Sequence, residues 1–167
     1  FKESLQKALR SLEIGRFGLG CDGKDKTLAC EPNSRQELQA ILNALKTPRP
    51  NRVFQIAQAF RRGASVDQIA ELTRIDPWFL RNLLEIVKEE RRLAGEKADN
   101  GRVLRRAKQL GFSDHQLGHM WKTSPADVRA QRKKYGVVAV YKLVDTCAAE
   151  FEAYTPYYYS CYEEEDE

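Results

Sequence analysis

The sequence predicts an all-α protein: a helical domain of two similar three-helix units, with an N-terminal helix and an extended Tyr-rich segment at the C-terminus. Three observations predict this class. Apolar residues recur at the 3.6-residue spacing of an amphipathic helix along most of the 167-residue chain. Capping residues mark the points where several of these helices begin. One stretch of the chain recurs 48 residues later with the same capping and breaking residues.

The first helix is predicted within residues 1–15, where the apolar stripe is formed by Leu5, Ala8, Leu9 and Leu12. Residues 16–33 contain several glycines and no helical period, so they are predicted to form a loop. Ser34 and Glu37 then form an S-x-x-E capping box for a second helix. The prolines of the segment 47–50 end that helix because they force an extended backbone.

The internal repeat gives the domain its two-unit architecture. Residues 63–81 align without gaps with residues 111–129, with Gly, Ser, Gln, Pro and Arg identical at equivalent positions. In each copy Gly ends one helix and Ser caps the next. The third helix begins at Asp76-Pro77 in the first copy and at Ser124-Pro125 in the second. The predicted helices are 51–62, 65–74 and 76–94 in the first unit (51–94), and 100–110, 113–122 and 124–135 in the second (99–136).

The helical period ends at Gly136. Residues 137–141 are mostly β-branched and are predicted to be a connector, or at most one short strand. The segment 141–163 is rich in tyrosine and would expose a large apolar patch in water, so it is predicted to lie against this domain or a neighbouring one. Its tyrosines suit an interface or a core-lining role. Lys142, Asp145 and Glu150 are candidates for a buried or interfacial polar network.

Composition excludes several classes of protein. A hydrophobic content of 42% with 31% charged residues fits a soluble globular chain, and no apolar run approaches the roughly 20 residues that span a bilayer. The chain starts without Met, already in helical pattern, and has no signal peptide, which indicates a piece of a longer cytoplasmic protein. The four cysteines, at positions 21, 30, 147 and 161, include no C-x-x-C pair, and reduced thiols are expected.

The charge distribution leaves a nucleic-acid function as the main alternative. Residues 102–134 contain nine Lys or Arg and two Asp. The segment 111–136 has the form of a helix-turn-helix whose second helix, 124–135, carries Arg129, Arg132, Lys133 and Lys134. However, the equivalent helix of the first unit, 76–87, is apolar on nearly all sides and is expected to be buried. A duplicated packing unit explains both copies, whereas DNA binding explains only one.

Three further patterns in the sequence are candidates for a catalytic or binding role. His115 and His119 share a helix face, but a metal site needs a further ligand, and a packed or solvated pair is the alternative. The glycines of residues 15–23 resemble a phosphate-binding loop, but a helix rather than a strand precedes them, which favours tight turns or mobility. Cys147 is a candidate nucleophile or a buried structural thiol. We therefore assign no catalytic, cofactor-binding or metal-binding residue to this chain.

Several motifs are shared with one known family. Residues 4–13, 73–80, 111–114 and 141–163 read SLQKALRSLE, TRIDPWFL, GFSD and YKLVDTCAAEFEAYTPYYYSCYE. These stretches, together with Ala59-Phe60-Arg61, resemble the oligomerisation domain of the carbamoyl phosphate synthetase large chain, its central helical domain. Ala139 stands where the family usually has Pro, and Cys161 where Thr is usual. The resemblance covers almost the whole chain and is weakest at residues 16–33 and 92–102.

The resemblance implies a non-catalytic scaffold. Residues 1–15 would lead out of one ATP-grasp half, residues 16–136 would form the oligomerisation domain, and residues 137–167 would lead toward a second ATP-grasp half. The implied parent is a ligase that makes carbamoyl phosphate from bicarbonate, glutamine-derived ammonia and two ATP, for pyrimidine and arginine synthesis. It would use Mg or Mn with ATP, potassium, and a glutamine amidotransferase small subunit, and would be a homo-oligomer.

The residues that we expect at interfaces or in structural contacts come from the aromatic start of helix 76–94 and from the Tyr-rich segment. They are Trp78, Phe79, Tyr141, Lys142, Asp145, Thr146, Cys147, Glu150, Phe151, Tyr157, Tyr159 and Tyr162.

Overall fold

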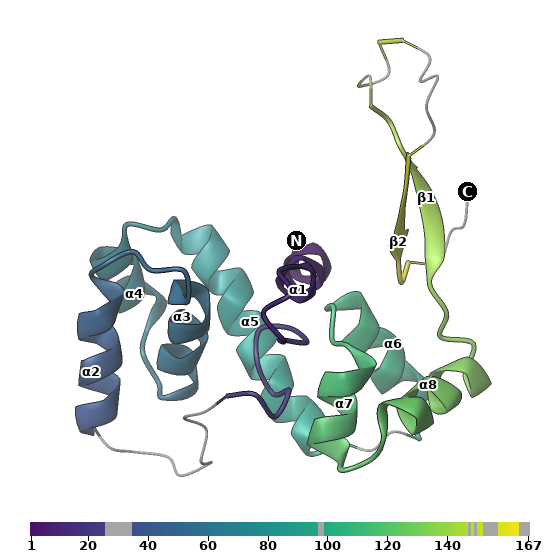
Figure 1. Cartoon of the computed structure of the whole chain (residues 1–167), viewed down its shortest axis with the longest axis horizontal. Coiled ribbons are helices and arrows are strands. Elements are labelled where there is room, and N and C mark those ends of the chain that lie inside the picture. Colours follow the sequence, from purple (N-terminus) through teal and green to yellow (C-terminus); the bar gives the residue numbers. More distant parts are fainter. Residues whose placement is uncertain (26–34, 97–98, 147, 149, 152–156, 164–167) are drawn as a thin grey trace.

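The computed structural model confirms a mostly helical fold (Figure 1). It describes residues 1–25, 35–96, 99–146, 148, 150–151 and 157–163. Within these residues the helices are α1 (Lys2–Ser11), α2 (Arg35–Leu45), α3 (Arg52–Arg61), α4 (Val66–Thr73), α5 (Pro77–Ala94), α6 (Gly101–Gln109), α7 (Asp114–Trp121) and α8 (Pro125–Lys134). The strands are β1 (Val140–Val144) and β2 (Tyr157–Cys161).

The internal repeat is a structural repeat. Helices α4 and α7 begin 48 residues apart, and so do α5 and α8. Ser65 and Ser113 each form a complete capping box with a Gln three residues later. Each of these helices ends on a residue in the left-handed conformation, Arg74 in α4 and Lys122 in α7. Because the turns agree as closely as the helices, the two units follow the same backbone path.

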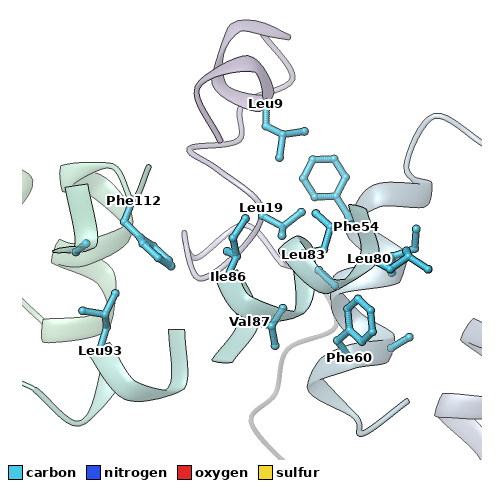
Figure 2. Packing of buried hydrophobic residues seen from close by; sticks show 14 of the residues in the cluster. Leu9, Leu19, Phe54, Phe60, Leu80, Leu83, Ile86, Val87, Leu93 and Phe112 are labelled. Atoms are coloured by element: carbon cyan, nitrogen blue, oxygen red, sulfur yellow. The ribbon is translucent and has the colours of Figure 1, made fainter. Parts of the chain in front are cut away.

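Helix α5 is the element that the two units share. It packs against α3 and α4 of the first unit and against α6 and α7 of the second. Figure 2 shows Leu83, Ile86 and Val87 of α5 in the middle of the buried core, with Phe54 and Phe60 of α3 toward one end and Phe112 toward the other. Leu83, Ile86 and Val87 are spaced three and four positions apart and so share one side of α5. Because α5 contacts helices of both units, their burial joins the units into a single core.

Helix α1 lies across the junction between the units (Figure 1). Its Leu9 is buried in the shared core, and α1 contacts α5 and α6. Gly111, which precedes α7, allows this close approach, because a Cβ at that position would overlap the backbone of Glu3. Gly111 also has a φ of 86°, a conformation that other residues adopt at a cost.

The described part of the predicted loop after α1 ends at Asp25. Arg16 pairs with the carboxylates of Asp22 and Asp25, 2.9 and 2.5 Å away. Leu19 is completely buried in the core. These contacts favour the interpretation of the glycines as tight turns. Ser34, the predicted cap of the second helix, lies outside the described residues, and α2 begins at Arg35.

A pair of buried glutamines joins α1, this loop and the second unit. The Nε2 of Gln116 donates to Oε1 of Gln6, 3.0 Å away, and to the carbonyl of Gly20, 2.7 Å away. Its Oε1 accepts from the amide and the hydroxyl of Ser113. Gln6 in turn donates to the carbonyl of Leu110 and accepts from the amide of Leu19. Both side chains are fully enclosed, so their polar atoms depend on one another.

The C-terminal segment is a β-hairpin that projects from the helical body (Figure 1). Strands β1 and β2 are antiparallel, in a register that runs from Val140 opposite Cys161 to Val144 opposite Tyr157. The prediction of a connector or at most one short strand at residues 137–141 agrees with β1, which begins at Val140, whereas strand β2 in the Tyr-rich segment was not predicted. Strand β2 was missed because three consecutive tyrosines hide the alternation between two faces by which a strand is recognised in a sequence.

Substitution of the buried Gln116 should lower the free energy of unfolding far more than substitution of Gln68, the equivalent residue in the first unit. We expect Gln116→Leu to lower the free energy of unfolding by about 3 kcal/mol, because it leaves the buried amide of Ser113 and the carbonyl of Gly20 without these partners and removes one of the two partners of Gln6 Oε1. Gln68→Leu removes the same capping box at the surface and should cost about 1 kcal/mol or less. Urea denaturation of both variants measures the difference. Equal losses would contradict a special role for the buried pair.

Candidate association surfaces

Exposed aromatic side chains gather at the start of α5. Trp78 and Phe79 are 51% and 45% exposed, and their ring centroids lie 4.9 Å apart. The ring of Phe1 packs against both, at 5.2 Å from Trp78 and 5.6 Å from Phe79. We call Phe1, Trp78 and Phe79 the aromatic patch. Three adjoining exposed rings form an apolar surface of the kind found at protein interfaces.

The start of α5 explains why these rings face outward. Asp76 caps the helix by accepting from the amide of Trp78 at 2.7 Å, and Pro77 occupies the first turn. Leu80 then faces the core and is completely buried. Since one turn of a helix cannot bury all its sides against one neighbour, Trp78 and Phe79 remain exposed. The expectation that helix 76–87 is buried all round was therefore wrong at these two positions. Phe1, the third member of the patch, was not identified from the sequence.

The hairpin forms a second exposed apolar surface. Residues directly opposite in the register share a face, so Tyr141 and Leu143 lie with Tyr158 on one side of the ribbon. Tyr157 and Tyr159 lie on the other side. All five side chains are exposed, as is Phe151 beyond β1, which is 76% exposed. Neither face of the outer ribbon is covered by the helical body.

The base of the hairpin, in contrast, is fixed to the helical body. Tyr162 is buried against the core, and its carbonyl accepts from Nε2 of Gln109 at 3.1 Å. The Nζ of Lys7 on α1 donates to the carbonyl of Ser160. Tyr162 therefore has the core-lining role that the sequence left open, while Tyr157 and Tyr159 do not.

The residues of the predicted polar network in the hairpin are exposed, except for Lys142, which is partly buried. Lys142 forms an ion pair with Glu163, with 2.9 Å between Nζ and Oε2. Asp145, Thr146 and Glu150 are exposed, so the buried form of the predicted polar network is wrong. An interfacial role for these residues stays a prediction. Cys147 lies outside the described residues.

Helix α8 is the basic helix of the nucleic-acid alternative, and its four basic side chains lie partly at the surface and partly in the interior. Arg129, Lys133 and Lys134 are exposed on α8. Arg132 instead faces inward, where its Nε donates to Asp114 at 3.0 Å and its Nη1 to the carbonyl of Val137. One of the four proposed contacts to DNA is thus used to hold the second unit together.

The two histidines that were candidate metal ligands lie against neighbouring residues of the fold. The ring of His115 stacks on Phe17 with 4.0 Å between centroids, and His119 lies against Gly23. Among the described residues no group of three His, Cys, Asp or Glu side chains is placed to hold a metal. Cys21 and Cys161 are free thiols. Burial and the nearby Glu90 raise the pKa of the Cys21 thiol, which makes it a poor nucleophile.

Buried ion pairs stabilise each of the two units. Arg61 of the first unit donates two hydrogen bonds, of 2.8 and 2.7 Å, to the carboxylate of Glu90. In the second unit Asp114 lies between Lys108 and Arg132, at 2.9 and 3.0 Å. Burial alone would raise the pKa of Asp114, but the charges and hydrogen bonds of these two cations outweigh burial and lower it.

Comparison with known proteins identifies the family. A sequence model described as the carbamoyl-phosphate synthetase large chain, oligomerisation domain, matches residues 1–136. The chain belongs to the carbamoyl phosphate synthetase large-chain family. This result confirms the resemblance seen in the sequence motifs. The hairpin lies beyond the residues matched by the domain model.

Curated relatives extend the similarity over the whole chain. The large chain of carbamoyl phosphate synthase from Archaeoglobus fulgidus is 49% identical over 173 aligned residues, and that from Synechocystis sp. is 50% identical over 168. These alignments cover 100% and 99% of the present chain but only 15% of each relative. A relative from Aquifex aeolicus, named the N-terminal section of the large chain, is 46% identical over 98% of the chain. The present chain thus spans about one seventh of the large chains from the first two organisms.

The ion pair at Asp114 predicts a pH dependence of stability in this oligomerisation domain. The pKa of Asp114 is lower in the folded state than the value of about 3.9 expected when unfolded. Its stabilising contribution is therefore fully present above the unfolded pKa and is lost as pH falls through the folded pKa. We expect Asp114→Asn to cost about 3 kcal/mol at pH 7 and much less at pH 2.

Urea denaturation across this pH range measures the effect. Asp67→Asn, at an exposed position in the first turn of α4, is the control and should change stability little at either pH. A cost for Asp114→Asn that is the same at pH 7 and pH 2 would contradict the assignment.

Proposed function

We propose that this chain is the non-catalytic association scaffold of a carbamoyl phosphate synthetase large chain. The observation that carries the proposal is the presence of two exposed aromatic surfaces, the aromatic patch and the outer hairpin, on an otherwise well-packed helical body. Membership of the oligomerisation-domain family supports it. Among the described candidates, His115 stacks on Phe17 and Arg132 pairs with Asp114, and such packing roles suit a scaffold.

The hairpin is proposed to pack against the ATP-grasp half that follows this domain in the parent chain. A two-stranded ribbon has little stability of its own in water. Exposed tyrosines on both faces supply rigid apolar area with a hydroxyl group at the rim, a combination that is common at interfaces. Burial of each ring would contribute about 1.5–3 kcal/mol. The hairpin is therefore better suited to an interface than to solvent.

The aromatic patch is proposed to mediate association between copies of the large chain. Its three rings are fixed by mutual contacts, so little side-chain entropy would be lost when a second copy covers them. Tryptophan is also among the residues that most often dominate the energy of an interface. The basic residues of α8 are not required in this arrangement.

For the parent enzyme we propose the activity implied by the family. It would make carbamoyl phosphate from bicarbonate, ammonia released from glutamine, and two ATP. It would act in the cytoplasm in pyrimidine and arginine synthesis, with Mg or Mn bound to ATP, with potassium, and with a glutamine amidotransferase small subunit. The present chain would join the two ATP-grasp halves that perform the chemistry. Among the described residues no helix is long and apolar enough to cross a membrane.

Light scattering after size-exclusion chromatography, over a hundredfold range of concentration, tests the scaffold role. We expect a dimer or larger species whose dissociation constant rises at least about tenfold in a Trp78→Ala, Phe79→Ala variant, because hot-spot aromatics carry most of an interface energy. The control is Arg129→Glu, Lys133→Glu, which reverses exposed charges on α8 and should leave association unchanged.

A monomer at every concentration would contradict self-association through this chain. The same is true of a patch variant that associates as strongly as the wild type. ATP hydrolysis by the purified chain would contradict the non-catalytic assignment.

A further inference from the structure

A small cavity with basic walls lies where α1, the second unit and the hairpin meet. Its volume is about 100 Å³. We call it the basic cavity, and its walls are formed by Lys7, Arg10, Lys108, Gly111, Phe112, Ala139, Ser160 and Tyr162. These residues come from three segments that are far apart in the sequence. Neither the domain family nor the proposed association surfaces account for the cavity.

The walls carry three cations and no carboxylate. The nearest acidic groups stand behind them: Glu3 pairs with Lys7 at 2.7 Å and Asp114 with Lys108 at 2.9 Å. Arg10 donates through Nη1 to the carbonyl of Gly111 at 2.8 Å. In the part of the chain that the structure describes, no carboxylate lies within ion-pair distance of Arg10. Within the described residues, one positive charge at this cavity therefore lacks a direct counter-charge.

The electrostatics of the walls are unfavourable without an anion. Burial lowers the pKa of Arg10 more than the surrounding acidic groups raise it. Burial likewise lowers the pKa of Lys108; Asp114 opposes this effect, and the neighbouring Arg132 and Arg10 add to it. Arginine nevertheless keeps its proton at physiological pH, so Arg10 stays charged. The unfavourable contribution is the burial of this positive charge without a direct counter-charge in the described part of the chain. An anion in the cavity would offset this cost.

We propose that the basic cavity binds a small inorganic oxyanion of the phosphate class. Arg10, Lys108 and Lys7 supply charged donors, and Ser160 and Tyr162 supply hydroxyl groups. Burial raises the pKa of Tyr162, so its phenol stays protonated and able to donate. A cavity of about 100 Å³ has room for one tetrahedral oxyanion.

The bound anion would strengthen the attachment of the hairpin. Lys7 already donates to Ser160, and Lys108 lies 5.2 Å from the centre of the Tyr162 ring. An oxyanion between these groups would accept hydrogen bonds from α1, the second unit and the hairpin at once. Anion binding should therefore slow the exchange of amide protons at the base of β2.

Titration of the chain with inorganic phosphate, followed by the amide shifts of Gly111, Phe112 and Ser160 in NMR spectra, tests the proposal. We expect saturable shifts in phosphate and none in sodium chloride of the same ionic strength. Arg10→Gln should weaken phosphate binding at least about tenfold, because it removes a charged donor. Arg129→Gln removes the same charge from an exposed position on α8 and should change the affinity less than about twofold.

A second variant covers the case in which Arg10→Gln does not fold. Tyr162→Phe keeps the buried ring and removes only the hydroxyl, and it should weaken phosphate binding about threefold or more. ADP separates a free oxyanion from the phosphate of a nucleotide, and it should bind more weakly than phosphate.

Three results would overturn the assignment. These are shifts that never saturate, equal losses in the Arg10 and Arg129 variants, and tighter binding of ADP than of phosphate at the same amides. Each result leaves the association role open to its own test, because that role depends on different residues.

Discussion

The arrangement of this domain depends on one buried contact between two glutamine side chains. Gln6 comes from the first helix and Gln116 from the seventh, and every donor and acceptor of the Gln116 amide is used. The pair positions α1, the loop around Leu19 and the start of α7 relative to one another. Leu19 and Leu9 can then fill the core from the side that the two units leave open. An apolar residue at either position would allow the elements to slide, because apolar contacts have little directional preference.

The same residue shows how duplication allows a surface feature to become an interior one. Gln68 caps α4 at the surface, and its equivalent Gln116 caps α7 in the same way but also reaches Gln6 and Gly20. The two units thus keep a common local geometry, since capping needs only neighbours in sequence. What differs is the surface that each unit presents to α1. The repeat is consequently symmetric in its turns and asymmetric in its contacts.

The sequence was sufficient to predict most of the helices because their signals are local. The 48-residue repeat and the capping residues predicted the starts of α4, α5, α7 and α8, which depend on short-range hydrogen bonds. The exposure of Trp78 and Phe79 was not predictable in this way. It depends on which side of α5 the first unit covers, and that is decided by tertiary packing. Strand β2 was missed for a different reason, because a run of tyrosines has the same pattern on both faces.

The candidate surfaces were predicted in part. The tyrosines of the hairpin and the two rings of α5 were identified from composition, but Phe1 joins the aromatic patch only through the fold. The basic cavity had no sequence signal, because its cations are separated by about a hundred positions and meet only where three segments come together. Residues that are distant in the chain carry no periodic pattern that would reveal their proximity.

The bond between Lys7 and Ser160 has a consequence for how the domain fits into a longer polypeptide. These residues are 153 positions apart and yet are in direct contact. The two ends of the intervening chain therefore lie close together, as in domains that tolerate insertion into a host protein. The spacing between whatever precedes α1 and whatever follows β2 is set by this short crossing. Segments of a longer polypeptide joined near the start of α1 and after β2 would therefore emerge close together.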